Sequence, residues 1–189
     1  MQTFTPDDLE EDILADLMEE INELYESSEQ TLIELELRPE DNELQRALFR
    51  SIHTIKGDLG LVNFSPMIPL LQHVEDLLDY LRKGQVAYTS TMSDLVLLTM
   101  DRVKAFVENV MANGKADYDD SLHNQLVLAI SRVTPDNAAD HEKRLTEAVL
   151  LLNPALDVVS SDDDPQRVQI KPPTLAATGI PKDISSEKK

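Results

Sequence analysis

Apolar side chains recur every three or four positions along most of the chain, which is the spacing of one face of an α-helix. The first such stretch opens on Thr5, Pro6 and two aspartates, an arrangement typical of a helix start, and it ends before Pro39. Its apolar stripe is expected to comprise Leu9, Ile13, Leu17, Ile21, Leu24, Ser28, Leu32 and Leu35. The pattern therefore predicts a first helix over residues 5–37.

The same spacing predicts further helices, separated by short loops that contain proline, glycine or asparagine. They cover about residues 39–62, 65–83, 90–113, 118–133 and 137–152. Ser65 is expected to cap the third helix, and Gly84 and Gly114 to end the third and fourth. No alternating strand pattern and no internal repeat is evident. Successive amphipathic helices with short loops predict an all-α fold: an up-and-down antiparallel four-helix bundle with extra helices.

Residues 157–189 depart from this pattern. They contain four prolines and many polar residues, without apolar periodicity. Such a composition cannot bury enough apolar surface to fold alone, which predicts a disordered tail or linker. We therefore expect three parts: a helical bundle over residues 1–134, an additional helix over 135–156, and the tail over 157–189.

Charge and composition narrow the possible functions. The 189 residues carry a net charge of −19, and 16 of the 36 acidic residues lie among the first 43, beside the single base Arg38. This surface repels phosphate backbones, so nucleic acid is not an expected partner. There is no cysteine, and no apolar run approaches the roughly 20 residues of a membrane span. We expect a cytoplasmic monomer that does not insert into membranes.

His53 lies in the second predicted helix, on the side opposite the apolar stripe. With a rotation of about 100° per residue from Leu44, the stripe is centred at about 20° and His53 falls at about 180°. The histidine's face and its flanks carry two glycines and three cations: Gly57, Gly60, Lys56, Arg46 and Arg50. An exposed imidazole with a free ring nitrogen and cationic neighbours is suited to accept a phosphoryl group, and bare glycines beside it would let a large partner approach.

The stretch HTIKGDLGLVNF, residues 53–64, resembles the phosphorylation motif H-x-x-K-G of histidine phosphotransfer (HPt) domains. Within that family it is most similar to the N-terminal phosphotransfer domain of chemotaxis-type histidine kinases, because VEDLLDYLRKGQ at 74–85 and MSDLVLLTMDRV at 92–103 follow at matching distances. The resemblance covers about residues 5–134. It implies a phosphorelay intermediate of two-component signalling, whose partners are a sensor histidine kinase and a response-regulator receiver.

The resemblance also implies a role for each matching residue. His53 corresponds to the phosphorylated histidine, Lys56 to the lysine that neutralises the phosphoryl group, and Glu75 to the acid that accepts the other ring N–H. We expect partner contacts from Gly57, Gly60, Arg46 and Arg50. No cofactor or metal of its own is implied, and Mg²⁺ is expected on the partner receiver.

Four positions depart from the family's pattern. Asp58 and Leu59 replace small residues, and Asp58 beside Lys56 is expected to moderate its charge. Asn63 replaces a glycine, which asparagine can do because it tolerates the left-handed conformation. Gln72 stands where related domains have a histidine, with His73 shifted by one, so Gln72 is expected to substitute as a hydrogen-bonding residue.

Alternatives remain open at this stage. No Walker loop is present, which predicts a phosphocarrier and not an ATP-hydrolysing enzyme. The chain is alternatively the N-terminal fragment of a larger chemotaxis-type kinase, with residues 157–189 as its linker, or a structural interaction bundle in which His53 is incidental. A metal site is not expected, because His73 and Glu75 do not share a helix face, and His123 and His141 are predicted at the surface of separate helices.

Overall fold

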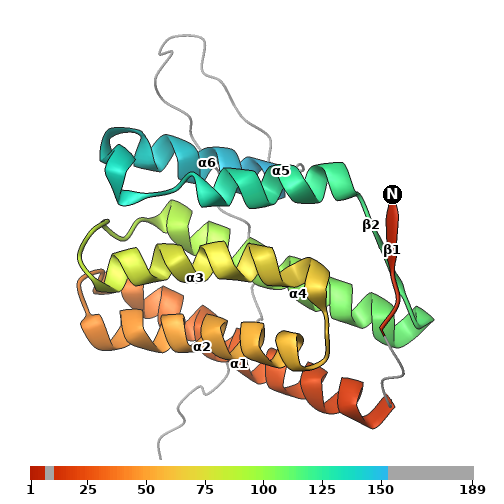
Figure 1. Ribbon diagram of the computed structural model, residues 1–189. Helices are drawn as coiled ribbons and strands as arrows, with labels where there is room; N and C mark the ends of the chain where they lie inside the picture. Colours follow the sequence, from red (N-terminus) through yellow and green to blue (C-terminus); the bar gives the residue numbers. More distant parts are fainter. Residues whose placement is uncertain (7–10, 153–189) are drawn as a thin grey trace, which may run out of the picture. The chain divides into compact units, whose positions relative to one another are not determined.

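The computed structural model of the chain describes residues 1–6 and 11–152, without the side chains of residues 137–139. Six α-helices dominate this part of the chain (Figure 1), and they confirm the predicted all-α class. They are α1 (Glu11–Leu37), α2 (Asn42–Leu61), α3 (Ile68–Arg82), α4 (Ser90–Asn113), α5 (Asp120–Ser131) and α6 (His141–Leu152). Short 3₁₀ turns, Ser65–Met67 and Pro135–Asp140, precede α3 and α6.

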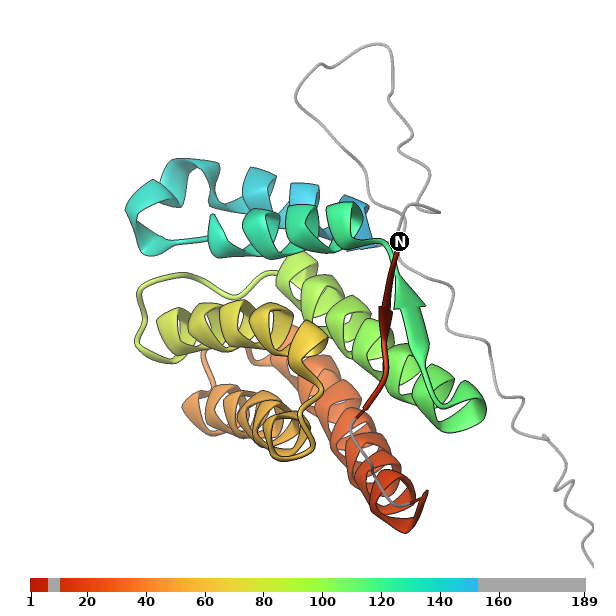
Figure 2. The same ribbon diagram turned by 45° about the vertical axis from the view of Figure 1, so that its right-hand side comes forward.

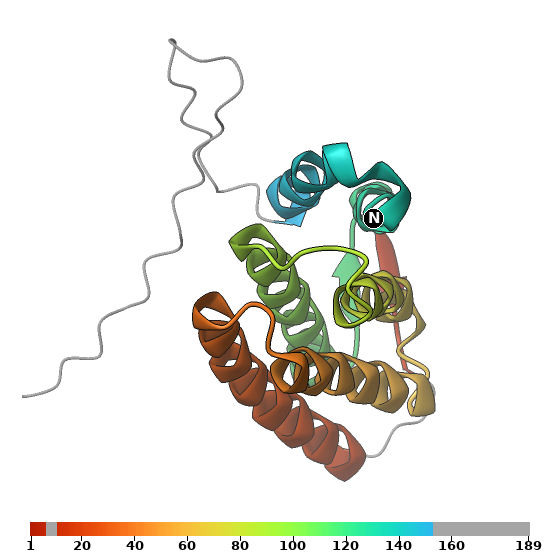
Figure 3. The same cartoon turned by 90° about the vertical axis from the view of Figure 1, so that its left-hand side faces the viewer.

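Helices α1 to α4 form the four-helix bundle (Figure 3). Helix α2 packs between α1 and α3, and α4 contacts both α1 and α3. Short connections force consecutive helices to run antiparallel, as the sequence predicted. The stripes of α2 and α3 meet in the core with exposures of 3% or less, through Leu48, Ile52, Ile55, Leu59, Leu70, Leu71, Val74, Leu77, Leu78 and Leu81.

Capping residues set most helix boundaries. Asp41 begins α2, and its side chain accepts hydrogen bonds from the backbone N–H groups of Glu43 and Leu44. Gly84 and Gly114 follow α3 and α4 with φ of 69° and 68°, as expected for left-handed C-terminal positions. Asn63 adopts φ 57°, so asparagine does take the left-handed conformation there.

The helix starts show two differences from the sequence reading. Ser65 begins a 3₁₀ turn and not the third helix, and α3 starts at Ile68, so that Pro69, which lacks an N–H, falls in its first turn. The start predicted for the first helix at Thr5 and Pro6 runs into residues 7–10, outside the described residues. In α1, Ile13 is 42% exposed and Leu14 takes the core position.

A small antiparallel sheet was not predicted. Strand β1 (Gln2–Phe4) pairs with β2 (Ala116–Tyr118), although the sequence showed no alternating strand pattern. The fifth helix, predicted from about residue 118, begins at Asp120, after β2. Three residues are too few to display the alternation that marks a strand. The pairing places the ring of Phe4 5.1 Å from that of Phe64 and 5.5 Å from that of Phe106, so β1 extends the core at this end of the bundle.

Helices α5 and α6 form a pair that lies over the bundle (Figure 2). Helix α5 packs on α3, while α6 packs on α4 and α5. This packing buries His123 and His141, which are only 5% and 8% exposed, so their predicted surface location was wrong. The sequence did not indicate which bundle face the last two helices would cover. The division at residue 134 stays a prediction, and the predicted tail, residues 157–189, lies outside the described residues.

Candidate functional site

His53 projects from the middle of α2 on the face turned away from the core. Its neighbours Ile52 and Ile55 are buried at 0% and 1% exposure, whereas the His53 side chain is 62% exposed. This confirms the orientation predicted from the helical spacing. The imidazole is therefore open to a partner molecule while its base is held by a rigid helix.

Glu75 of α3 reaches across to this histidine. Its Oε1 lies 3.2 Å from His53 Nδ1, and the Glu75 side chain is only 12% exposed. A carboxylate can only accept, so this contact assigns the proton to Nδ1 and leaves the lone pair on Nε2. The packing of α2 on α3 thus produces the tautomer that a nucleophilic imidazole needs.

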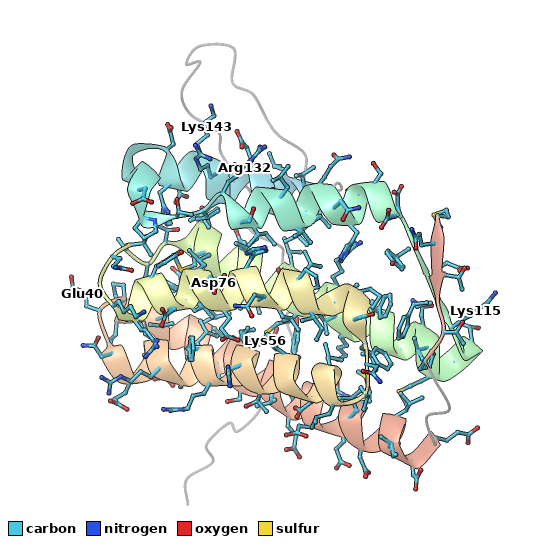
Figure 4. The ribbon with its side chains drawn as sticks, in the orientation of Figure 1. Glu40, Lys56, Asp76, Lys115, Arg132 and Lys143 are labelled. Carbon is cyan, nitrogen blue, oxygen red and sulfur yellow. The ribbon has the colours of Figure 1, made fainter. Side chains whose placement is uncertain are left out.

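Lys56, one turn after His53, binds the other oxygen of the same carboxylate. Its Nζ lies 2.7 Å from Glu75 Oε2 and donates to Gln72 Oε1 at 2.9 Å. The Lys56 side chain is 18% exposed and lies where α2 meets α3 (Figure 4). Glu75 is therefore shared between an imidazole and an ammonium group.

Gln72 takes part in this network but contacts Lys56 rather than His53. Its Nε2 donates to Asp76 Oδ1 at 2.9 Å, and Asp76 Oδ2 lies 3.6 Å from His73 Nδ1. This contact with Asp76 links a second histidine, His73, to the site. The sequence reading did not single out Asp76, although its position one turn after Gln72 on the same helix could have suggested the contact.

Asp58 does not have the role expected of it. No hydrogen bond or ion pair joins it to Lys56 in the described part of the chain, and its Oδ2 is buried without a hydrogen-bonding partner there. Burial raises the pKa of the Asp58 carboxyl. Glu75 and Gln72, and not Asp58, are the partners of the lysine.

An aromatic ring borders the imidazole on its N-terminal side. Phe49 lies one turn before His53, with ring planes 14° apart and centroids 6.0 Å apart. The Arg82 guanidinium sits 4.5 Å from the centre of the Phe49 ring and is held by Asp79, whose pKa is lowered by Lys83 and by Arg82 itself. Sequence reasoning missed both Phe49 and Arg82. The four-residue spacing could have revealed Phe49, but Arg82 comes from another helix.

The surface of α2 around His53 has glycines on the C-terminal side and arginines on the N-terminal side. Gly57 and Gly60 are exposed, and a Cβ at either would meet nothing within 4 Å, so neither glycine is required by packing. Arg46 and Arg50 are exposed on the N-terminal side. Arg46 pairs with Glu43 at 3.1 Å. The predicted partner-binding residues therefore do share one face.

The described residues contain no group of three or more histidine or acidic side chains placed to hold a metal ion. None of their helices combines the length and the apolar character needed to cross a bilayer.

Comparison with known proteins gives matches that include this site. Residues 12–132 match the model of the Hpt domain. The sensor histidine kinase CheAY of Helicobacter pylori is 34% identical over 145 residues, which are 75% of this chain and 18% of that protein. Chemotaxis protein CheA of Halobacterium salinarum is 34% identical over 109 residues, 58% of this chain and 16% of that protein. The chain thus spans less than a fifth of the length of these relatives.

Two solved structures share the fold. The CheA phosphotransferase domain from Thermotoga maritima has a TM-score of 0.52 and 32% identity, over 54% of this chain and 97% of that one. The solution structure of a histidine phosphotransfer domain of CheA has a TM-score of 0.54 and 29% identity, over 64% of this chain and 92% of that one.

Proposed function

Because the chain belongs to the Hpt domain family, we propose that it is a phosphorelay intermediate of two-component signalling in which His53 carries the phosphoryl group. The observation that carries this proposal is the contact of 3.2 Å between His53 Nδ1 and Glu75 Oε1 on a side chain that is 62% exposed. It leaves Nε2 as the nucleophile and the ring open to a partner.

This geometry supports the following transfer. The lone pair of Nε2 forms the N–P bond while the bond from phosphorus to the donor oxygen breaks, and the electron pair leaves with that oxygen. The donor is ATP bound to a histidine kinase or the acyl phosphate of a receiver. Because Nδ1 keeps its proton, the ring becomes positively charged, and the Glu75 carboxylate stabilises that charge. Transfer to a receiver aspartate reverses these bond changes.

The exposed face of α2 fits a receiver as the acceptor. A receiver must bring an aspartate into bonding distance of the phosphoryl group, so its loops must lie close to the helix. Gly57 and Gly60 offer no side chain in the way, and Arg46 and Arg50 supply positive charge for an acidic active site. Mg²⁺ belongs to the receiver in this proposal.

The chain alone is proposed to be a carrier without ATP-binding machinery, working in the cytoplasm as a monomer. Its match to less than a fifth of the chemotaxis kinases supports a second possibility, that it is the N-terminal phosphotransfer part of a larger kinase. Residues 157–189 would then link it to the next domain. The two possibilities use the same histidine and differ only in whether the kinase lies in the same polypeptide.

The test is phosphorylation of His53→Gln. Incubation with ATP and a chemotaxis-type kinase that lacks its own phosphotransfer domain should label the unmodified protein with one acid-labile, base-stable phosphoryl group. His53→Gln should abolish the label and leave the helical circular dichroism unchanged. His73→Gln, which changes the partly exposed histidine of α3, is the control and should still be labelled. Equal labelling of the His53 variant would instead favour a structural bundle with an incidental histidine.

A further inference from the structure

Asp76 lies on α3, one turn after Gln72, and has no role in the transfer described above (Figure 4). Its side chain is 47% exposed, and its Oδ1 accepts the hydrogen bond of 2.9 Å from Gln72 Nε2. The other end of the same amide, Oε1, accepts from Lys56 Nζ at 2.9 Å. Gln72 therefore bridges a carboxylate and an ammonium group.

These two partners leave the amide only one favourable orientation. A carboxylate only accepts hydrogen bonds and an ammonium group only donates them. If the Gln72 amide were reversed, its NH₂ would face Lys56 and its carbonyl oxygen would face Asp76, and neither pair could form a hydrogen bond. Asp76 and Lys56 together thus fix the carbonyl oxygen of Gln72 toward Lys56, and Asp76 holds the opposite end of the amide.

The orientation of Gln72 in turn affects Lys56. A lysine carries its charge on a flexible four-carbon chain, which normally extends into water. Here the side chain is only 18% exposed, and its ammonium group is held by Gln72 Oε1 and Glu75 Oε2. Without the amide oxygen, Lys56 would have one acceptor fewer in the site and more freedom to turn toward solvent.

We propose that Asp76 is a positioning residue of the phosphoryl-accepting site, which fixes the Gln72 amide so that Lys56 stays on Glu75 and Glu75 stays directed at His53 Nδ1. This inference rests on the proposed function. Lys56 then acts on the unphosphorylated histidine through the Glu75 carboxylate, which contacts both. His73, 3.6 Å from Asp76 Oδ2, lies beside the outer end of this series of contacts.

The test compares Asp76→Ala with Asp76→Asn. Alanine removes the acceptor, so the initial rate of phosphoryl acceptance should fall about 3- to 10-fold, a small part of what a positioned catalytic group contributes. Asparagine keeps an acceptor oxygen and should restore at least half of the normal rate. Asp101→Ala is the matched control: it removes an exposed aspartate that accepts one hydrogen bond, at 2.7 Å from Tyr25, on another helix. Its rate should be unchanged.

A double-variant cycle separates positioning from a general loss of stability. In a Gln72→Leu background the amide is already gone, so Asp76→Ala should cause no further loss of rate. A general structural effect of Asp76→Ala would instead lower the rate by the same factor in both backgrounds. Thermal unfolding of each variant shows whether it is folded, and Asp76→Ser replaces the alanine variant if that one is not.

The outcomes distinguish this inference from the proposed function. If the unmodified protein accepts phosphate and His53→Gln does not, while Asp76→Ala reacts at the normal rate, the positioning role is refuted alone. An equal loss from Asp76→Ala in both backgrounds also refutes it. If the unmodified protein is not phosphorylated at all, the proposed function fails first.

Discussion

Glu75 is the residue on which the chemistry of the site converges. One of its carboxylate oxygens faces the imidazole at 3.2 Å and the other faces Lys56 at 2.7 Å. Its side chain is only 12% exposed, so few water molecules can reach the carboxylate and replace either partner. In the proposed transfer, this carboxylate is the group that would stabilise the charge forming on the ring.

Replacing Glu75 should consequently slow transfer without removing the nucleophile. Glu75→Ala should lower the initial rate of phosphoryl acceptance by about 10-fold or more, within the range expected for loss of a positioned acid–base group. The rate of Glu75→Gln should lie between those of Glu75→Ala and the unmodified protein, because glutamine keeps an acceptor oxygen for Nδ1–H but loses the negative charge. Rapid-quench measurements with a phosphorylated receiver would give these rates. Asp101→Ala, which removes an exposed acid of α4 that accepts a hydrogen bond from Tyr25, serves as the control. A normal rate for Glu75→Ala would contradict the proposed tautomer.

At this scale the sequence revealed only part of the site. The helical period and the motif spacing were enough to predict four residues of the site, on two different helices: His53, Lys56, Glu75 and Gln72. Phe49 and Asp76 were one turn away from residues already singled out, yet their contacts depend on rotamers that spacing does not determine. Arg82 reaches Phe49 from another helix, so its contribution required the packing of α3 on α2.

At the scale of the element, α2 has one face that packs and one that is exposed. The packing face is buried to 1% or less at Leu48, Ile52, Ile55 and Leu59. The opposite face contains Gly57, inside the helix, and Gly60, in its last turn. A glycine in a helix interior costs about 1 kcal/mol relative to alanine. Since a Cβ at Gly57 or Gly60 would meet nothing within 4 Å, this cost has no explanation in the packing of the bundle. The proposed access for a receiver would explain it.

We therefore expect Gly57→Leu to separate stability from transfer. The variant should be as stable as the unmodified protein or more stable by up to about 1 kcal/mol, because leucine has the higher helix propensity and open space to occupy. Phosphoryl exchange with a receiver should fall strongly, since the leucine would stand beside His53 where the receiver's loops approach. Denaturant unfolding and receiver transfer assays measure the two effects. Exchange at the normal rate would contradict the docking proposal, and Gly57→Ala should give a smaller loss than leucine.

Helical elements were the feature of the fold that the sequence predicted best. A stripe repeated over 12 to 27 residues, as in α5 and α1, gives many independent positions that agree on one period. The strands β1 and β2 have three residues each and depend on pairing between segments more than 100 residues apart, as in the register of Gln2 with Tyr118. No local pattern specifies such a pairing.

At the scale of the whole described bundle, the covering pair α5 and α6 introduces a second group of ionisable residues. His123 lies against the ring of Tyr118, with centroids 5.6 Å apart, and its Nδ1 is buried without a hydrogen-bond partner among the described residues. Both ring nitrogens of His141 are buried in the same way. Burial lowers the pKa of both histidines; the charge of Arg102 lowers that of His123 further, against a smaller opposing effect of Asp120.

These lowered values predict that the buried histidines destabilise the fold in acid. Around and below the ordinary histidine pKa of about 6.5, the unfolded chain binds protons that the folded chain refuses. The contribution of each histidine to the free energy of unfolding is therefore largest when it is neutral, and it is lost as the pH falls from about 6.5 toward the lowered folded-state pKa. The net trend of the protein also includes Asp58 and Asp94, whose pKa values are raised by burial and act in the opposite sense. The effect of the histidines must therefore be measured as a difference between variants.

His123→Leu isolates this contribution. Leucine fills a site that is only 5% exposed but cannot bind a proton, so the variant should lose less stability than the unmodified protein between pH 7.5 and pH 5. Thermal unfolding at the two pH values detects the difference, because about 1 kcal/mol corresponds to roughly 2–4 °C in Tm for a chain of this size. His73→Gln, at a side chain 31% exposed on α3, is the control for replacing a histidine outside the covering pair. Parallel pH profiles for His123→Leu and the unmodified protein would show that His123 binds protons equally in the folded and unfolded states, which would contradict its burial between α5 and the bundle.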